Sequence, residues 1–151
     1  GGMTREVISH FIFLSERILG PLNLVWAFTD HPAEGNLCET QVAARLVNEV
    51  GLPVTIMGSV GGAQPERQEV TIKGSKISRR ISEFAIDTVS SGEPFVPTDS
   101  IADDTRATSL KAQLDDLTLL MAGKPNRLAT IDEALRVQIL IEEILACPGS
   151  N

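Results

Sequence analysis

Two neighbouring stretches decide the fold: residues 38–47, CETQVAARLV, and residues 53–60, PVTIMGSV. Both contain the β-branched residues that strands favour, and the NEVG segment at 48–51 reads as a turn between them. A connection this short joins antiparallel strands, because a parallel crossover needs a dozen or more residues. The pair therefore predicts adjacent antiparallel strands in one sheet.

Three further stretches carry strand signals on either side of this pair: residues 22–29, 67–73 and 77–86. Glycine, proline and asparagine interrupt the chain between them, and the short gaps again favour antiparallel pairing. Within 67–73, Val70 and Ile72 alternate with polar side chains, so one face is covered and the other is left for a ligand or another subunit. We expect an open, mainly antiparallel sheet.

A helix is predicted over residues 5–19. Thr4 is a suitable N-cap, Glu6 lies in the first turn, where its charge suits the helix dipole, and Gly20-Pro21 is a stop signal. At helical spacing the expected apolar stripe consists of Val7, Phe11, Leu14 and Ile18, widened by Ile8, Ile12 and Leu19. An adjacent face carries Glu6, His10, Phe13 and Arg17.

Two more helices are predicted near the end of the chain, over residues 104–122 and 130–146. The first has an apolar stripe formed by Leu110, Leu114, Leu117 and Met121, and the second has one formed by Ala134, Val137, Ile141 and Ile144. Thr130 and Glu133 are spaced as a capping box at the start of the second. The predicted fold class is α+β, with the N-terminal helix and both C-terminal helices packed on one face of the sheet.

Composition narrows the possible functions. A chain of 151 residues fits one domain, and a hydrophobic fraction of 42% is enough for a core. The net charge of −7 and the aromatic content of only 4% argue against nucleic acid and anionic membranes as partners. No apolar run approaches the roughly 20 residues of a spanning helix, so a cytoplasmic protein is expected. Cys38 and Cys147 are predicted to be reduced thiols, with a chance disulfide formed by oxidation as the alternative, and no metal site is predicted.

Glu6 and His10 form the most suggestive pair for chemistry. They lie four residues apart and are therefore neighbours on one helix face. A carboxylate beside an imidazole raises its basicity and holds its orientation, as proton transfer requires. The alternative for this pair is an ordinary solvated helix face.

Other polar and glycine-rich segments favour structural interpretations. His31 lies in a predicted turn, and Gly58 to Gly62 follow a strand without opening a helix, so they read as a strand end and tight turn rather than a phosphate loop. Arg79 and Arg80 fall on opposite faces of a predicted strand, which favours surface charge over an anion site.

Three segments, taken in their order along the chain, resemble the C-terminal domain of the glucose-fructose oxidoreductase / inositol dehydrogenase (Gfo/Idh/MocA) family. The first is GGMTREVISH at 1–10, similar to the family's glycine-led helix with an acidic residue and a histidine. The second runs from ETQVAARL at 39–46 to TIMGS at 55–59 and VTIKGS at 70–75. The third is AGKP at 122–125 with TIDEALRV at 130–137. Together they span nearly the whole chain.

The resemblance implies a substrate-binding and oligomerisation domain over 1–151, with the dinucleotide-binding domain lying outside these residues. It implies that His10 faces the nicotinamide of NAD or NADP and acts with a lysine of that other domain in proton transfer. Glu6 matches the acidic position, although the family usually has Asp there and often Gly where Ile8 stands. It further implies a sugar or polyol substrate and a homodimer or homotetramer formed through the sheet face.

Two hypotheses stay open from the sequence. One is this part of an NAD(P)-dependent oxidoreductase, which by itself is expected neither to bind NAD(P) tightly nor to catalyse, because it lacks a Gly-x-Gly-x-x-Gly unit. The other is a non-enzymatic ligand-binding or dimerisation module. A nucleotide-binding unit encoded upstream of Gly1 would decide for the first hypothesis, and a start codon near Met3 would decide for the second.

Overall fold

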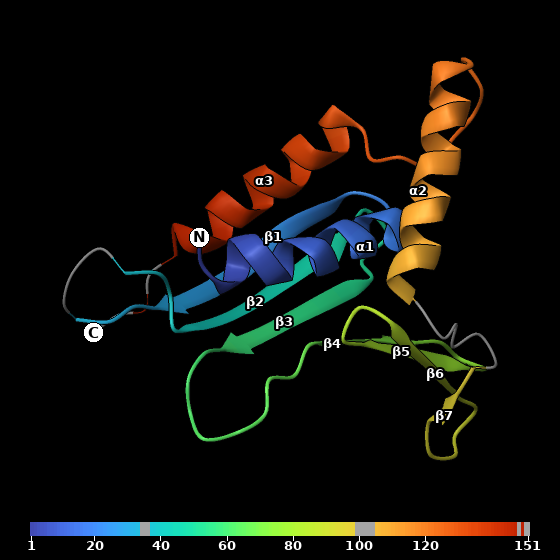
Figure 1. The fold of residues 1–151 in the computed structure, drawn as a ribbon. Coiled ribbons are helices and arrows are strands. Elements are labelled where there is room, and N and C mark those ends of the chain that lie inside the picture. The colour runs from blue at the N-terminus through green and yellow to red at the C-terminus, as the bar shows by residue number, and fades with distance from the viewer. Residues whose placement is uncertain (34–36, 99–104, 148, 150–151) are drawn as a thin grey trace. The chain divides into compact units, whose positions relative to one another are not determined.

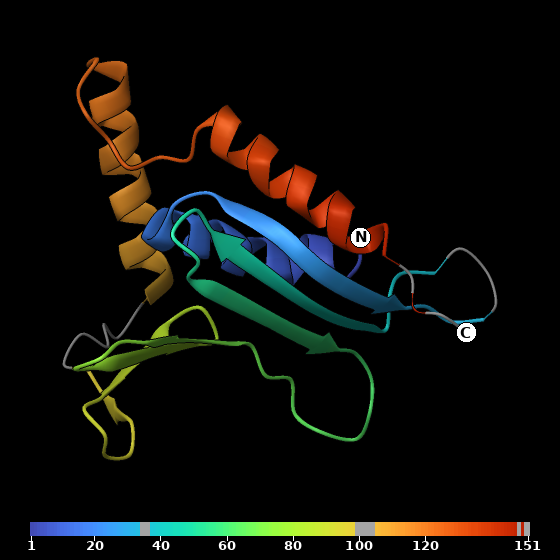
Figure 2. The same cartoon turned by 180° about the vertical axis from the view of Figure 1, so that it is seen from behind.

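A computed structural model describes residues 1–33, 37–98, 105–147 and 149. By its internal contacts the chain divides into two compact units. The first consists of Gly1–Gln64 with Ala129–Asn151, and the second consists of Pro65–Leu128. Each unit has its own antiparallel sheet (Figures 1 and 2). The prediction of one domain over 1–151 stays a prediction.

The first unit is a three-stranded antiparallel sheet covered by helices. The chain order is a π-helical turn η1 (Thr4–Ile8), α1 (Ser9–Leu19), β1 (Leu22–Asp30), β2 (Gln41–Asn48), β3 (Pro53–Ser59) and α3 (Ile131–Leu145). The strands lie in the order β1-β2-β3, and both pairings are antiparallel. The antiparallel pairing predicted from 38–47 and 53–60 is therefore confirmed.

A β-bulge at Val25 decides which side chains of β1 face the helices. Leu24 pairs with Leu46, whereas Trp26 pairs with Arg45, so Val25 is the extra residue. Because side chains alternate along a strand, one extra residue reverses the facing of everything after it. The bulge thus places Trp26 and Phe28 on the outer face, away from the helices.

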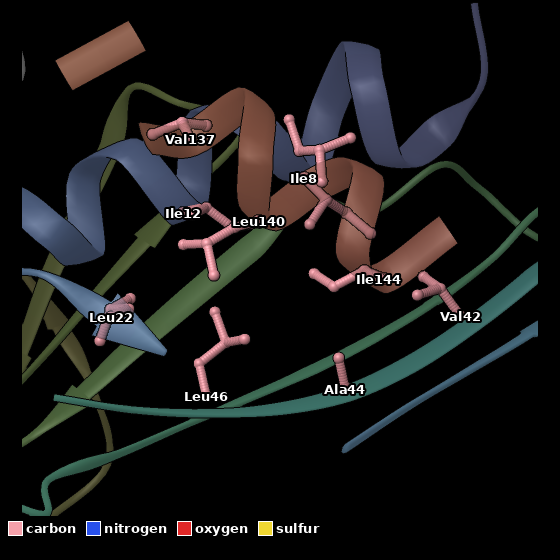
Figure 3. Packing of buried hydrophobic residues seen from close by; sticks show 10 residues of the cluster. Ile8, Ile12, Leu22, Val42, Ala44, Leu46, Val137, Leu140 and Ile144 are labelled. Atoms are coloured by element: carbon pink, nitrogen blue, oxygen red, sulfur yellow. The ribbon is translucent and has the colours of Figure 1, made fainter. Parts of the chain in front are cut away.

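The core of the first unit lies between the inner face of the sheet and its helices. In Figure 1 α1 lies in front of the strands, and Figure 3 shows how the side chains meet. The buried cluster consists of Ile8, Ile12, Leu22, Val42, Ala44, Leu46, Val137, Leu140, Ile141 and Ile144. Burial of these aliphatic side chains is the main stabilising contribution of the unit.

The predicted apolar stripe of the first helix is wrong in its phase. Residues 7, 11 and 14 are only half-buried and Ile18 is exposed, whereas the buried positions are Thr4, Ile8, Ile12 and Glu16. The reason is the π-helical turn η1, whose wider i→i+5 bonding shifts the helix away from the 3.6-residue period. Side chains that were expected only to widen the stripe form its buried centre.

The predicted start of the last helix is confirmed in detail. The Glu133 backbone N–H donates to Thr130 Oγ1 at 3.2 Å, and the Thr130 N–H donates to Glu133 Oε2 at 2.8 Å. This capping box satisfies two backbone donors that a helix start otherwise leaves unpaired. Val137, Ile141 and Ile144 of the predicted stripe are buried, together with Leu140.

The second unit has a four-stranded antiparallel sheet in the order β4-β5-β6-β7 and one helix. The elements are β4 (Glu69–Lys73), β5 (Ser78–Ser82), β6 (Ile86–Ser90), β7 (Val96–Pro97) and α2 (Thr105–Met121). The predicted strand 77–86 is wrong because Glu83 and Phe84 both have positive φ, which makes a turn between β5 and β6. The predicted helix start at residue 104 lies outside the described residues.

The α+β class and the antiparallel pairing are confirmed, but the single predicted sheet is two sheets. The segment between β3 and β4 contains Gly61, Gly62 and Pro65, which do not support a continuous ladder. Of the two C-terminal helices, α3 packs on the first sheet, whereas α2 belongs to the second unit. No helix in the described ranges is long and apolar enough to cross a membrane.

Candidate functional site

The helix that carries Glu6 and His10 begins in an unexpected way. Thr4 was the predicted N-cap, but it lies inside η1, and the residue at the N-cap position, Met3, makes no side-chain capping bond. The Thr4 backbone N–H instead donates to Glu39 Oε1 at 2.6 Å. The prediction is wrong because the cap comes from a residue far along the chain, just before β2.

Glu39 is a buried carboxylate, only 3% exposed. Burial acts to raise the pKa of its carboxyl, but hydrogen bonding from Thr4 and the nearby His31 outweigh it and hold the pKa below its ordinary value. Glu39 is therefore ionised at neutral pH. A negative charge at a helix N-terminus also suits the helix dipole.

Gly2 is fixed as glycine by this carboxylate and by its own backbone. Its φ is +113°, a conformation that side-chain-bearing residues rarely adopt. A Cβ at this position would lie 2.7 Å from Glu39 Oε2 and 3.2 Å from the Cβ of Cys38. The Gly2 carbonyl accepts the Glu6 N–H at 2.9 Å, so Gly2 also sets the backbone position of Glu6.

Glu6 and His10 are both exposed, on the side of the helix away from the core. The Glu6 side chain is 72% exposed, and its Oε1 lies 4.0 Å from the Gly1 amino group. Burial among core residues would have argued against a catalytic role. Neither side chain is buried in this way. The helix therefore presents a carboxylate and an imidazole outward, four residues apart.

The same helix continues this polar face toward α3. The Arg17 guanidinium lies over the Phe13 ring, 5.1 Å from its centroid, and Arg17 Nε lies 2.8 Å from Glu133 Oε1. The predicted grouping of Phe13 and Arg17 on one face is thus present. Arg17 ties the end of α1 to the capping box of α3.

Arg5 ties the beginning of the helix to the end of α3. Its Nε and Nη2 donate to Glu142 Oε1 at 3.1 and 3.0 Å, and Nη2 donates to Glu142 Oε2 at 2.7 Å. Hydrogen bonding to Arg5 lowers the pKa of the Glu142 carboxyl, and the same bonding raises the pKa of Arg5.

A pocket of about 460 Å³ lies beside the helix start. It opens to solvent, and polar groups provide much of its wall. Neither Glu6 nor His10 lines it. Its lining residues are Gly1, Arg5, His31, Leu37, Cys38, Glu39, Glu142, Leu145 and Ala146.

The sequence interpretation missed Glu39, Arg5 and Glu142. They are distant in sequence and meet only because β2 and α3 pack beside the helix start. The one signal that could have drawn attention to Glu39 is a carboxylate two residues before a strand that becomes buried. Nothing local to Glu39 indicates that its partner is Thr4.

The remaining candidates take structural roles. Gly58 lies within β3, where a Cβ would come 2.9 Å from Met3 Sδ, and Gly61 and Gly62 have positive φ after the strand. This confirms a strand end and turn. Arg79 forms an ion pair with Asp87, and Arg80 lies 3.3 Å from Glu69 and over the Phe95 ring, so both cations face partners within the second unit.

Comparison with known proteins adds information at the level of the fold. No protein-family model matches the sequence, and no curated protein matches it significantly. Several solved structures do match in three dimensions. KijD10, a 3-ketoreductase from Actinomadura kijaniata in complex with TDP-benzene and NADP, gives a TM-score of 0.73 at 16% identity, covering 98% of this chain and 48% of that chain.

Two further oxidoreductases are similar to the same extent. The dehydrogenase MviM from Clostridium difficile gives a TM-score of 0.75 at 12% identity, covering 95% of this chain and 47% of that one. UDP-N-acetylglucosamine 3-dehydrogenase GnnA from Acidithiobacillus ferrooxidans gives 0.75 at 14% identity, covering 97% and 47%.

The chain therefore has a fold found in dehydrogenase and ketoreductase structures, and it spans about half the length of the chains it matches. The resemblance seen in the sequence is confirmed at this level. With identities of 12 to 16%, the likeness concerns the fold.

Proposed function

We propose that this chain is the substrate-facing C-terminal domain of an NAD(P)-dependent oxidoreductase of the Gfo/Idh/MocA family. One observation carries the proposal: nearly the whole chain matches the fold of several oxidoreductases while spanning about half of their length. The other half of such a protein would supply the nucleotide-binding domain. A cytoplasmic location is part of the same proposal.

In this proposal His10 is the proton-transfer residue. It is exposed on the outer side of α1, where a substrate held by a second domain could reach it. As a carbinol carbon gives up hydride, its hydroxyl proton passes to the imidazole, and in reduction the imidazole returns it. Glu6, one turn earlier, would stabilise the protonated imidazole and hold its orientation.

NAD or NADP would supply the hydride acceptor or donor. The strands of the first unit are joined as antiparallel neighbours, so its described residues form no parallel βαβ unit to hold a pyrophosphate. The exposure of His10 supports a place for this helix face at the edge of the nicotinamide site. The cofactor would therefore be held mainly by the other domain, with His10 facing the nicotinamide.

The proposed substrate is a sugar, a polyol or a related hydroxyl or carbonyl compound. Two of the similar structures carry names that refer to position 3 of their substrates, and one of them is a dehydrogenase of a nucleotide-linked sugar. Nucleotide-linked sugars therefore come first in a test panel, followed by free sugars and polyols.

The outer face of the first sheet is proposed to pair with a second copy of the chain, as a homodimer or within a homotetramer. Trp26, Phe28 and Met57 are exposed there, with Met57 83% exposed. Among the residues that pair directly with these three across the sheet, Arg45 is the one charged side chain. Its Nη1 donates to Thr55 Oγ1 at 3.4 Å. An apolar face with so little charge can pack against its own symmetry copy without repulsion.

The function is tested with the full-length protein and a panel of nucleotide-linked sugars, sugars and polyols. Reduction of NAD⁺ or NADP⁺ is followed by absorbance. We expect His10→Ala to lower kcat by about 10²- to 10⁴-fold, as loss of a general base does, while the Kd for the nucleotide stays nearly unchanged. Ile18→Ala, an exposed change on the same helix, is the matched control.

The outcomes separate the hypotheses. A wild-type protein that reduces neither cofactor with any member of the panel argues for a non-enzymatic module. Turnover that is unchanged in His10→Ala would remove His10 from the mechanism while leaving the oxidoreductase proposal in place.

The proposed pairing surface has its own test. Met57→Lys and Trp26→Ser place polar groups on the outer face, so we expect sedimentation to show a shift from dimer or tetramer to monomer. Ile131→Lys, on the exposed side of α3, should leave the mass unchanged. Assembly that persists in both outer-face variants would assign the interface to another surface.

A further inference from the structure

The carboxylate of Glu39 is the one buried acid that touches the start of the helix bearing Glu6 and His10, within the part of the chain that is described. A helix start leaves its first backbone N–H groups without internal partners. Here Met3 provides no side-chain cap, and the acceptor for Thr4 arrives from a segment 35 residues further along the chain. The position of this helix start is therefore set by the segment just before β2 and not by the helix itself.

Thr4 transmits this restraint to the polar face. Its N–H is held by Glu39, and its carbonyl accepts the N–H of Ser9, the residue before His10, in the wide π-helical turn. One carboxylate thus fixes one end of the hydrogen-bonded turn whose other end adjoins His10. Turns of this kind depend on such local restraints because their geometry is less favourable than that of an α-helix.

Gly2 transmits the same restraint to Glu6. The Gly2 carbonyl accepts the Glu6 N–H at 2.9 Å, and the Gly2 Cα lies against the Glu39 carboxylate so closely that a Cβ would be 2.7 Å from Oε2. A displacement of Glu39 would therefore move the backbone that holds Glu6. Glu6 is thus connected to Glu39 through Gly2, and His10 is connected to it through Thr4 and the neighbouring Ser9.

A second buried acid, which belongs to the helix itself, provides the comparison. Glu16 is also buried, and its Oε1 accepts the Leu22 N–H at 3.1 Å. It stabilises the opposite end of the helix and has no bonded path to Thr4 or Gly2 among these contacts. A general stabilising role would make the two carboxylates equivalent, whereas a positioning role belongs to Glu39 alone.

We infer that Glu39 is a positioning residue for Glu6 and His10: its buried carboxylate fixes the turn of the helix that presents both side chains. The inference rests on the proposed function for its catalytic meaning. Gly2 is the packing partner that the arrangement requires, because any larger residue would displace the carboxylate.

The first test uses the 151-residue chain and amide hydrogen exchange measured by NMR. Glu39→Ala removes the acceptor, so we expect exchange at Glu6 and Ser9 to rise by about tenfold, as for loss of a helix cap. Glu39→Gln keeps an amide oxygen for the Thr4 N–H and should recover most of the protection. Gly2→Ala presses on the carboxylate without removing it and should resemble Glu39→Ala.

Glu16→Ala and Glu16→Gln are the matched controls. They should lower overall stability while leaving exchange at Glu6 and Ser9 in line with the rest of the helix. Equal effects of Glu39→Ala and Glu16→Ala at those two amides would overturn the inference. If Glu39→Ala does not fold, Gly2→Ala decides: full protection at Glu6 and Ser9 in that variant would overturn it as well.

The second test measures turnover in the full-length protein. We expect Glu39→Ala to lower kcat by about tenfold or more, with Glu39→Gln recovering most of it, while KM for the nucleotide changes less than about twofold. Parallel changes in kcat and nucleotide KM would count against positioning. If the wild type transfers no hydride, the proposed function fails, and the exchange experiment still decides the role of Glu39.

Discussion

The Arg5 guanidinium forms a two-pronged ion pair with the Glu142 carboxylate, with Nη2 lying 2.7 Å from Oε2. The pair joins the π-helical turn at the beginning of the chain to the last turn of α3. Gln138 Nε2 also donates to Glu142 Oε1, at 2.6 Å, so the carboxylate is held on two sides. The pair and Glu39 both lie at the pocket beside the helix start.

Because both side chains are about half exposed, this ion pair should contribute little to stability. In a double-mutant cycle with Arg5→Ala and Glu142→Gln, we expect a small coupling free energy that falls further as salt is raised. The measurement is urea unfolding at low and high ionic strength. A coupling that does not respond to salt would mean that the pair is better shielded than its exposure indicates.

Truncation of the core should be far more costly than truncation of an exposed side chain of the same type. Ile144 is completely buried, whereas Ile131 is 86% exposed at the start of α3. We expect Ile144→Ala to lower the free energy of unfolding by about 2–5 kcal/mol and Ile131→Ala by less than about 0.5 kcal/mol. Comparable losses in the two variants would contradict the assigned packing of α3.

Stability should depend on pH through Glu133. Hydrogen bonding from the Thr130 backbone, together with Arg17, lowers the pKa of the Glu133 carboxyl from 4.5 to about 2. A lowered folded-state pKa stabilises the fold above pH 4.5, and this contribution disappears as the pH falls toward 2. Urea unfolding of wild type and Glu133→Gln should therefore differ most above pH 5 and converge near pH 2.

Arg17→Gln separates the two causes of this shift. It removes the charged partner but leaves the capping bond from Thr130, so the pH dependence should weaken without vanishing. Wild type and Glu133→Gln that differ equally at every pH would rule out titration of this carboxyl as the cause.

Asn48 should be sensitive to the loss of each of its hydrogen bonds. Its Nδ2 donates to the Leu19 carbonyl at 2.8 Å, and its Oδ1 accepts the N–H groups of Val50 and Leu52 at 3.2 and 2.8 Å. We expect Asn48→Ala to cost about 1–3 kcal/mol because it leaves partly buried polar groups without partners. Thermal unfolding gives the measurement.

Asn48→Asp is the informative partner variant, because it keeps an acceptor for the two N–H groups but places a carboxylate oxygen against the Leu19 carbonyl at the C-terminal end of α1. Repulsion between these oxygens should make it at least as destabilising as Asn48→Ala. The opposite order would place the main contribution of Asn48 in the turn before β3 instead of the end of α1.

Sequence patterns predicted what is local in this protein. The capping box at Thr130 depends on two residues three positions apart, and the hairpin of β2 and β3 depends on a short turn between strand-forming stretches. The common helix face of Glu6 and His10 also follows from helical spacing. These features could be inferred because their determinants lie within one turn or one hairpin of each other.

Only the tertiary structure decided the features that join distant residues. Glu39 replaces Thr4 as the cap, the π-helical turn changes which helix face is buried, and one extra residue at Val25 turns Trp26 to the outer face. Each depends on which backbone donors and side chains meet after the sheet and helices have packed. A periodic pattern predicts that an element forms, but its phase and its partners are set by burial and hydrogen bonding across the fold. The sequence thus determined most of the elements and the shared helix face of Glu6 and His10, and packing decided what holds that pair in place.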